Sequence, residues 1–371
     1  MKRDELTAIL RECYKPGRTC GVQKIPGFGF ENVWFVVPPA PPRSLPKDLP
    51  ANAIGRANQP DTNEGKSERA SVLGYAHALE KEILATFKKS VAVFSMKLAS
   101  RLHKEVILKD PAFLGVPGQI RKTPVFIGGL RRKEESIYNP TPPKHIARCL
   151  NNVMNWMQDQ EIIELGDAGM GMPLPVRMAV GHAHFEAVHP FEDGNGRVGR
   201  MLMTLQMASH RVLPFYISGY IEAEKSEYGN ALQMAQKKLK FAPIVEFICE
   251  AIISSYKETQ STKTAIQLLP EQWAKRGLFR KGSAANRLLT HIVACPIFSV
   301  KQVQKHLRVS KPAANSAVRQ LVKARIIRER TGSERYRIFA AEEVLELLAR
   351  GFSEQPEVAL LRAAQLLTLK V

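Results

Sequence analysis

The chain has 371 residues, of which 44% are apolar and 24% charged, and its 54 Lys and Arg exceed its 35 Asp and Glu to give a formal charge of +19. This composition excludes a disordered chain, and the length predicts two or three hydrophobic cores. No stretch approaches the roughly 20 apolar residues of a membrane-spanning helix, and the first five residues do not begin a secretory signal. We therefore expect a cytoplasmic protein without a membrane partner.

The N-terminal third changes from an irregular to a helical pattern. Residues 15–66 are broken by Pro and Gly, so residues 1–70 are interpreted as a Pro-rich arm without long regular elements. Between Ser71 and Leu108 apolar residues recur at helical spacing, which predicts two helices or one bent helix. Residues 119–129 are rich in β-forming residues and end in paired glycines, which predicts an edge strand or hairpin.

More helices are predicted along the middle of the chain. The prolines before Lys144 predict a helix that runs to about Gln160. Helical patterns also cover residues 174–188, the stretch from Gly194 to about Arg211, and residues 223–256. We therefore predict one helical domain over residues 71–258, followed by a linker over residues 259–283.

The C-terminal part reads as three short helices and two strands. Residues 285–294, 300–307 and 313–324 are the predicted helices, and two β-like runs, 326–329 and 336–339, flank a Thr-Gly-Ser turn. This order over residues 284–349 is typical of a winged helix-turn-helix. Residues 350–371 are predicted to form an amphipathic tail helix.

The basic charge is concentrated in this C-terminal part. Residues 261–340 hold 17 Lys and Arg against three Glu, a net +14 of the total +19. Lys311, Asn315 and Arg319 share one face of the third helix, and Arg335 and Arg337 border the wing, which suits a DNA groove and its phosphates. Winged helices also dock proteins, and basic faces are often only solvated, so DNA and protein partners both stay open.

The five cysteines are odd in number and scattered, at positions Cys13, Cys20, Cys149, Cys249 and Cys295. They lack the close pairs that a zinc site requires. We interpret them as free buried thiols without a chemical role.

A short segment, residues 189–200, combines groups that suit phosphoryl chemistry: His-Pro-Phe-Glu-Asp-Gly-Asn-Gly-Arg-Val-Gly-Arg. Gly194 and Gly196 allow positive φ and, with the N-terminus of the following helix, predict an anion cradle. Arg197 and Arg200 share a helix face and offer forked donors to phosphoryl oxygens. The segment therefore predicts a phosphate-binding site.

Two further groups in the same segment suit catalysis on a polyphosphate. Asp193 supplies the hard oxygen that Mg²⁺ prefers. His189 could take the proton from an incoming hydroxyl as that hydroxyl attacks phosphorus. Each group alone is commonly structural, but a mere turn requires neither a base, nor a carboxylate, nor two cations.

Residues 189–200 resemble the signature of the Fic family, His-x-Phe-x-(Asp/Glu)-Gly-Asn-Gly-Arg-x-x-Arg, at every specified position. The resemblance covers roughly residues 30–256, and one Fic subgroup also carries a C-terminal winged helix. It implies a mostly α fold, namely a Fic-type helical bundle with a small β-hairpin flap, followed by the winged helix-turn-helix. Residues 71–258 would then be the Fic catalytic domain.

The resemblance also implies an activity. Fic proteins usually transfer AMP from ATP to a Ser, Thr or Tyr hydroxyl of a target protein and release pyrophosphate, so ATP and Mg²⁺ are the expected cofactors. His189, the general base, and Arg197 would be catalytic, and Asp193 would hold the metal. The implied nucleotide-binding residues are Gly194, Asn195, Gly196, Arg197, Arg200, Tyr220 and Tyr228. The two tyrosines match positions near the adenine, although aromatic residues at helical spacing also pack in cores.

Two regulatory features remain open at this level. Residues 119–129 resemble the flap whose edge pairs with a target segment, and a simple structural hairpin is the alternative. Glu64 lies where relatives carry an inhibitory (Ser/Thr)-x-x-x-Glu-(Gly/Asn) pattern, but Pro60 stands four residues before it. Glu64 is thus a candidate inhibitor that would pair with Arg200, or an ordinary solvated carboxylate.

The main alternative is a DNA-binding regulator whose nucleotide site is a sensor or is degenerate. A Fic enzyme that moves another phosphoryl-containing group or removes AMP is a second alternative. The expected partners are a hydroxyl-bearing target protein and DNA bound through the winged helix, and a homodimer is left open.

Overall fold

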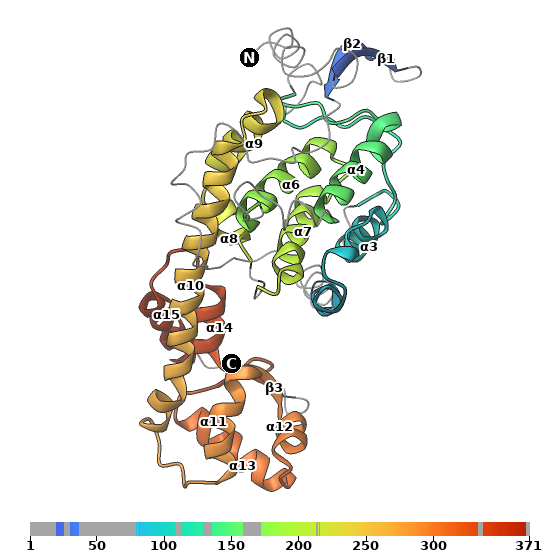
Figure 1. Cartoon of the computed structure of the whole chain (residues 1–371). Helices are drawn as coiled ribbons and strands as arrows, with labels where there is room; N and C mark the ends of the chain where they lie inside the picture. Colours follow the sequence, from blue (N-terminus) through green and yellow to red (C-terminus); the bar gives the residue numbers. More distant parts are fainter. Residues whose placement is uncertain are drawn as a thin grey trace. The chain divides into compact units, whose positions relative to one another are not determined.

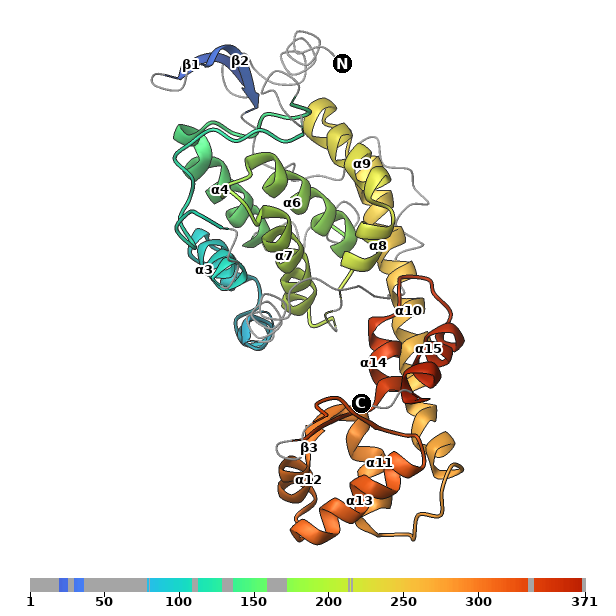
Figure 2. The same cartoon turned by 180° about the vertical axis from the view of Figure 1, so that it is seen from behind.

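The computed structural model describes residues 20–25, 30–36, 79, 81–108, 113–128, 136–158, 172–212, 214, 216–332 and 337–368. The chain divides into two compact units, one formed by Met1–Pro60 and Lys66–Ser255 and the other by Asp61–Gly65 and Tyr256–Val371. Each unit is mostly helical in its described part, as predicted (Figures 1 and 2). None of the helices described combines the length and the apolar composition of a membrane span.

The first unit begins with a strand pair. β1 (Cys20–Ile25) and β2 (Phe30–Val36) run antiparallel, with Cys20 opposite Val36. These two short strands were not predicted within the arm, and the β-branched and aromatic composition of residues 33–36 favours them despite the nearby Pro and Gly. The remainder of residues 1–70, including Glu64, lies outside the described residues.

Helices make up the rest of the first unit. They are a helical stretch over residues 81–89, η1 (Ser90–Val93), α3 (Met96–Ile107), α4 (Pro143–Gln158), α6 (Leu174–Val188), α7 (Asn195–Ser209), α8 (Ser218–Ala223), α9 (Lys225–Lys238) and the part of α10 (Ala242–Ala274) up to Ser255. α6 and α7 pack side by side, with α4 and α9 against α6 and α3 against α7 (Figures 1 and 2). The predicted helical stretch before Leu108 is two helices, interrupted where Ser90 takes φ 51° and Ser95 caps α3.

α6 is the central helix of this unit. Every residue from Val176 to Val188 is buried, and so is most of α7. A helix that is buried all round lies in the interior of a domain, which explains why α6 shows no amphipathic stripe. The connection from His189 to Gly194 therefore starts and ends in the core.

The predicted hairpin over residues 119–129 is not formed in the described residues 113–128 and 136–142. Ile127 and Tyr138 make one isolated antiparallel bridge, with their N–H and carbonyl groups paired at 3.0 and 3.1 Å. Pro124 has no N–H to donate, and the N–H of Arg121 donates to the Pro190 carbonyl at 3.0 Å instead of to a partner strand. This segment is tied to the connection between α6 and α7.

The second unit contains the remainder of α10 and the C-terminal elements. These are α11 (Ala284–Ala294), β3 (Ile297–Ser299), α12 (Val300–Leu307), α13 (Lys311–Lys323), β4 (Arg328–Glu329), β5 (Ile338–Ala340), α14 (Glu342–Ala349) and α15 (Pro356–Thr368). The predicted linker over residues 259–283 is wrong in its first part, because α10 continues to Ala274 and buries Leu269 and Trp273 in this unit's core.

The three predicted helices and the tail helix of this unit are confirmed, and two elements were not predicted. β3 pairs with β5, which lies between β3 and β4 in the sheet, and Phe298 stands opposite Phe339. β3 has three residues, and the last of them, Ser299, is also the cap of α12. So short a segment shows no strand pattern in the sequence. α14 was also missed, and its buried Glu342 forms an ion pair with Arg328 at 3.1 Å and another with Arg330.

The cysteine prediction is partly confirmed. Cys149 and Cys249 are buried thiols outside any disulfide, but Cys295 is an exposed thiol at the end of α11. The side chains of Cys13 and Cys20 lie outside the described residues.

Candidate active site

His189 lies at the end of α6 in a conformation that is unusual for a residue with a side chain. Its φ of 48° and ψ of 64° are left-handed, and its N–H donates to the Phe185 carbonyl at 2.9 Å. A left-handed non-glycine residue costs about 1–2 kcal/mol. Contacts outside the helix must therefore hold this turn.

Glu186, one helical turn before His189, faces the imidazole. Its Oε2 lies 3.6 Å from His189 Nδ1, and its side chain is buried. Burial acts to raise the pKa of Glu186, but interaction with His189 and the charges of His182 and Arg200 outweigh it, so the net pKa lies below its ordinary value. An ionised carboxylate here favours a proton on Nδ1 of His189 and leaves the lone pair on Nε2, as a general base requires.

The N-terminus of α7 is open to an anion. Gly194 caps it with φ 74° and contributes no side-chain acceptor to the first-turn N–H groups. A Cβ at Gly194 would lie 2.9 Å from Ile107 Cδ1, so both the backbone and the packing require glycine. A Cβ at Gly196 would meet the Arg200 guanidinium at 3.2 Å. The missing side chain of Gly194 thus lets the loop pack against α3, and the missing side chain of Gly196 leaves space beside Arg200 at the positive end of the helix dipole.

The two arginines and the aspartate meet at this helix end. Asp193 is exposed, its Oδ1 accepts the Gly194 N–H at 2.6 Å, and its Oδ2 lies 3.7 Å from Arg197 Nη2. Arg200 stands one turn further and acts electrostatically on the buried carboxyl of Glu186. The structure therefore brings a carboxylate and two cations of the predicted set to one helix terminus.

Asn195 has a different role from the predicted one. Its side-chain oxygen accepts the Phe191 N–H at 2.9 Å, and its side-chain nitrogen donates to the Phe191 carbonyl at 2.8 Å. The side chain is buried. In this geometry the Asn195 carboxamide closes the loop on itself, and binding of phosphate by Asn195 stays a prediction.

Phe191 and a buried histidine fix the loop to α3. The rings of Phe191 and His103 stack with centroids 4.0 Å apart. His103 Nδ1 accepts the Gly118 N–H at 2.8 Å, so its Nε2 carries the proton and donates to the Asp193 carbonyl at 3.1 Å. Burial lowers the pKa of His103 to about 4, which keeps the ring neutral as these two bonds require.

Of the two tyrosines expected near an adenine, Tyr228 lies close to the loop. Its hydroxyl is 2.6 Å from His182 Nε2, and His182 lies on α6 next to Gly199. Burial raises the pKa of Tyr228, the charge of Glu186 adds to this, and Arg200 opposes it. Because the charges of Glu186 and Arg200 act on its hydroxyl, Tyr228 lies near both of these side chains.

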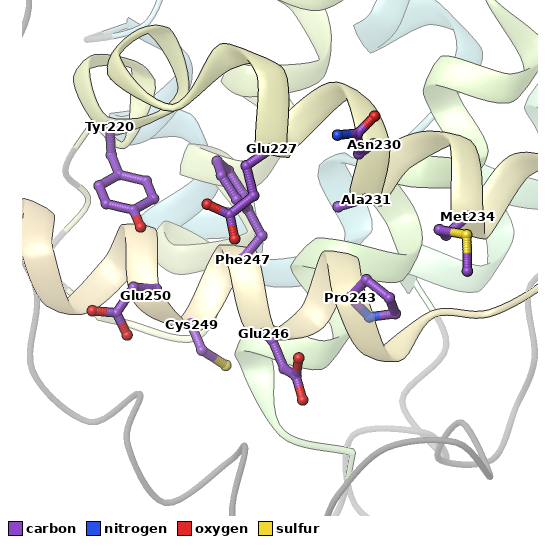
Figure 3. A pocket seen from close by; sticks show the side chains of 10 residues that line it. All are labelled: Tyr220, Glu227, Asn230, Ala231, Met234, Pro243, Glu246, Phe247, Cys249 and Glu250. Carbon is purple, nitrogen blue, oxygen red and sulfur yellow. The ribbon is translucent and has the colours of Figure 1, made fainter.

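Tyr220 lines a pocket between α8, α9 and α10 and packs on Phe247, the ring that Tyr228 also contacts, with centroids 5.3 and 5.6 Å away. Figure 3 shows Tyr220 and Glu227 facing the helix that carries Phe247 and Glu250. The cavity has a volume of about 460 Å³, and Glu246 is a third carboxylate in its lining. Burial and the charges of Glu250 and Glu227 raise the pKa of Tyr220 to about 12. Carboxylates repel phosphates, so this pocket suits no part of the triphosphate.

Sequence reasoning missed two residues that hold His189. Glu186 could have been found, because residues three apart on a helix share a face. Arg121 gives no local signal, since its side chain reaches the His189 carbonyl across 68 positions of sequence, at 2.7 Å.

Comparison with known proteins agrees with this geometry. Residues 93–207 match the sequence model of the Fic/DOC family. The chain is 26% identical over 180 residues to a probable protein adenylyltransferase of Aquifex aeolicus, covering 44% of this chain and 52% of that protein. It is 27% identical over 206 residues to the protein adenylyltransferase fic-1 of Caenorhabditis elegans, covering 54% of this chain.

The chain spans 52% and 36% of the lengths of these two relatives. Among solved structures, it is similar to a Fic family protein from Desulfovibrio desulfuricans, with 16% identity, a TM-score of 0.37, and 70% of this chain and 73% of that chain covered. It is also similar to a fragment of Fic-1 from C. elegans, with 23% identity, a TM-score of 0.39, and 55% of each chain covered. The loop from His189 to Arg200 lies within the residues that match the Fic/DOC family model.

Proposed function

We propose that this protein transfers AMP from ATP to a Ser, Thr or Tyr hydroxyl of a target protein. The observation that carries the proposal is the geometry at the junction of α6 and α7. A histidine oriented by a buried carboxylate stands five residues before a helix N-terminus whose cap, Gly194, provides no side-chain acceptor. The relatives named protein adenylyltransferase support the same reaction.

The phosphates fit the N-terminus of α7. The first-turn N–H groups, including that of Gly196, and the side chains of Arg197 and Arg200 provide the donors. Arg197 neutralises charge that develops on the reacting phosphoryl group, and Arg200 binds the terminal phosphate. The adenine contacts expected of Tyr220 and Tyr228 stay predictions; both rings pack on Phe247, and Tyr220 also lines an acidic pocket.

Mg²⁺ fits the same helix end. Asp193 offers one exposed carboxylate with an oxygen 3.7 Å from Arg197, and no cluster of three or more potential ligand side chains occurs in the described residues. Mg²⁺ commonly takes one or two protein carboxylates together with substrate phosphates and waters. The metal would supply charge neutralisation between the α- and β-phosphates.

The reaction needs only one proton acceptor from the chain. The target hydroxyl oxygen forms a bond to the α-phosphorus, the bond from that phosphorus to the bridging oxygen breaks, and pyrophosphate leaves with the electron pair. Nε2 of His189 takes the hydroxyl proton, and Glu186 stabilises the imidazolium that results. Positioning and charge neutralisation supply the remainder of the rate.

Labelled ATP tests the proposal. We expect label from the α-phosphate, and none from the γ-phosphate, on protein after incubation with Mg²⁺, ATP and a cell lysate. His189→Ala should lower labelling by about 100-fold or more, the typical contribution of a general base. His145→Ala on α4 is the matched control, because its half-buried histidine lies outside the loop, and it should label like the wild type.

Other outcomes would replace this reaction. Transfer of γ-label would identify a kinase-like reaction, and loss of label from a previously labelled target would identify removal of AMP. Absence of both with retained ATP binding would favour a sensor or a degenerate site. Cytoplasmic location, inhibition by Glu64 and a homodimer stay predictions.

A second function is favoured by the charge of the second unit. We propose that residues 284–349 form a winged helix-turn-helix that binds duplex DNA through α13. The order α11, β3, α12, α13, β4 and β5 supports the fold. Lys311 and Arg319 are exposed on α13, whereas Arg337 is less available because it lies 3.4 Å from Glu329 and over the Phe339 ring.

Salt dependence tests DNA binding. Affinity for a labelled duplex should fall linearly on a log-log plot against salt, and Arg319→Ala should reduce the slope by about one. Lys263→Ala, which removes an exposed charge on α10, should leave the slope unchanged. Affinity that does not depend on salt would favour a protein partner.

A further inference from the structure

Arg121 is a buried cation near the active site whose guanidinium makes several hydrogen bonds. Its side chain is 3% exposed and donates to four main-chain carbonyls. Nε donates to His189 at 2.7 Å, Nη1 to Thr123 at 2.8 Å, and Nη2 to Thr141 at 2.6 Å and Val188 at 3.3 Å. Its own N–H donates to the Pro190 carbonyl at 3.0 Å.

These contacts satisfy the end of α6. The last carbonyls of a helix have no partner within the helix and carry the negative end of its dipole. Arg121 supplies both the donors and the positive charge there, at the carbonyls of Val188 and His189. Because His189 is a non-glycine residue with φ 48°, a fixed external partner is what its backbone requires.

The geometry of the fork also links two segments. Two acceptors of the fork, the carbonyls of Val188 and His189, lie at the end of α6, and the acceptor on Thr123 belongs to the segment that ends in the bridge at Ile127. The exposed carboxylate of Glu192 lies close enough to act on this charge, and burial still lowers the pKa of Arg121 to about 10, so it stays protonated at neutral pH.

We propose that Arg121 is a positioning residue that fixes the left-handed turn at His189 and thereby aims the imidazole at the incoming hydroxyl. This rests on the proposed transfer reaction. Arg121 touches only main-chain carbonyls of the loop and its neighbours, so it acts through His189 and not on the nucleotide. The phosphate donors of α7 do not depend on it.

Lysine substitution separates positioning from stability. Arg121→Lys keeps the charge but replaces a planar fork with a single ammonium that cannot reach all four carbonyls. The matched control is Arg177→Lys at the other end of α6, where a fully buried guanidinium donates to the Met157 carbonyl at 3.1 Å and lies 2.9 Å from His210 Nε2. Both variants lose buried hydrogen bonds in the same domain.

The measured quantities are kcat for α-label transfer, the Kd of a non-hydrolysable ATP analogue, and Tm. We expect Arg121→Lys to lower kcat about 10- to 100-fold, the effect of a base misplaced by about 1 Å, with the Kd within twofold of the wild type. Arg177→Lys should lower Tm to a similar extent and leave kcat within about twofold. An unchanged kcat in Arg121→Lys, or an equal loss in both variants, overturns the proposal.

Amide hydrogen exchange keeps the two proposals distinguishable. If the wild type transfers no label, the proposed function fails, but the His189 and Phe191 amides should still exchange faster in Arg121→Lys than in Arg177→Lys. Equal exchange in both variants overturns the positioning role. If Arg121→Lys does not unfold cooperatively, Arg121→Gln, which keeps two amide donors and buries no charge, replaces it in all measurements.

Discussion

Two helix-to-helix connections in this protein end their first helix in the same way but begin their second helix differently. Between α12 and α13 of the second unit, Arg308 ends the first helix at φ 52° and Ser310 caps the second by accepting the Ala313 N–H. Between α6 and α7 of the first unit, His189 ends the first helix at φ 48°, and Gly194 begins the second without a side-chain cap. Both connections end a helix at a left-handed residue, but only the connection between α12 and α13 has a side-chain cap on the second helix.

The difference lies in where the hydrogen-bond partners come from. The α12–α13 connection takes its turn and its cap from residues within four positions of each helix end, and one distant side chain, that of Arg287, donates to the Leu307 carbonyl at 2.7 Å. The α6–α7 connection takes its carbonyl donors from Arg121 and its packing from His103, both far away in sequence. In the part of the chain that the structure describes, the cap Gly194 gives the first N–H groups of α7 no side-chain acceptor, which is what an anion-binding helix end needs.

Acidification should produce the largest difference in stability between the first unit and the second unit. The folded pKa of His103 is about 4, below its ordinary 6.5, so the unfolded chain binds more protons between these values. The contribution of neutral His103 to the unfolding free energy is complete above pH 6.5. It is lost as the pH falls toward 4, and it amounts to about 3 kcal/mol. His184, stacked on Phe241, behaves in the same way because burial lowers its pKa to about 4.

Amide exchange corrected for its intrinsic pH dependence measures this loss separately in α3 and α13. The second unit should lose less, because its facing histidines, His291 and His306, lie closer to the surface. His103→Gln can keep both hydrogen bonds without titrating and should flatten the pH dependence of α3. Equal losses in α3 and α13 would show that the buried histidines do not control acid stability.

The comparison also explains what could be predicted from sequence. The end of α6 and the start of α7 could be predicted because Pro190 and Gly194 determine the backbone conformation at their own positions. The roles of Arg121 and Asn195 were not, since a side-chain donor can bind either a phosphate or a distant main-chain group, and only the fold decides which. β3 was missed because its strand pairing with β5 spans about 40 positions.

Gly194→Ala should give the next largest effect. A Cβ at φ 74° costs about 1–2 kcal/mol and would also press on Ile107 at 2.9 Å, so we expect the first unit to lose about 2 kcal/mol of unfolding free energy. The displaced α7 terminus should weaken binding of an ATP analogue. Urea unfolding and analogue titration measure both, and Gly229→Ala, at a glycine with open space around its Cβ position, is the control.

Ser299→Ala should remove a cap from the second unit without affecting transfer. The Ser299 side chain accepts the Gln302 N–H, and Gln302 Oε1 accepts the Ser299 N–H at 2.8 Å. Loss of such a capping box costs about 1 kcal/mol. Urea unfolding of the second unit measures the cost, and kcat for label transfer should stay unchanged.

Arg308→Gly should give the smallest effect, and it has the opposite sign. Arg308 is exposed and left-handed at the end of α12, and glycine adopts φ 52° without the Cβ penalty. We therefore expect a gain of up to about 1 kcal/mol in the unfolding free energy of the second unit, seen as a higher urea midpoint. The same change at His189 would also relieve strain but would abolish transfer, because there the strained residue carries the base. A stabilised His189→Gly that still transfers label would mean that the left-handed turn at the end of α6 serves the backbone alone.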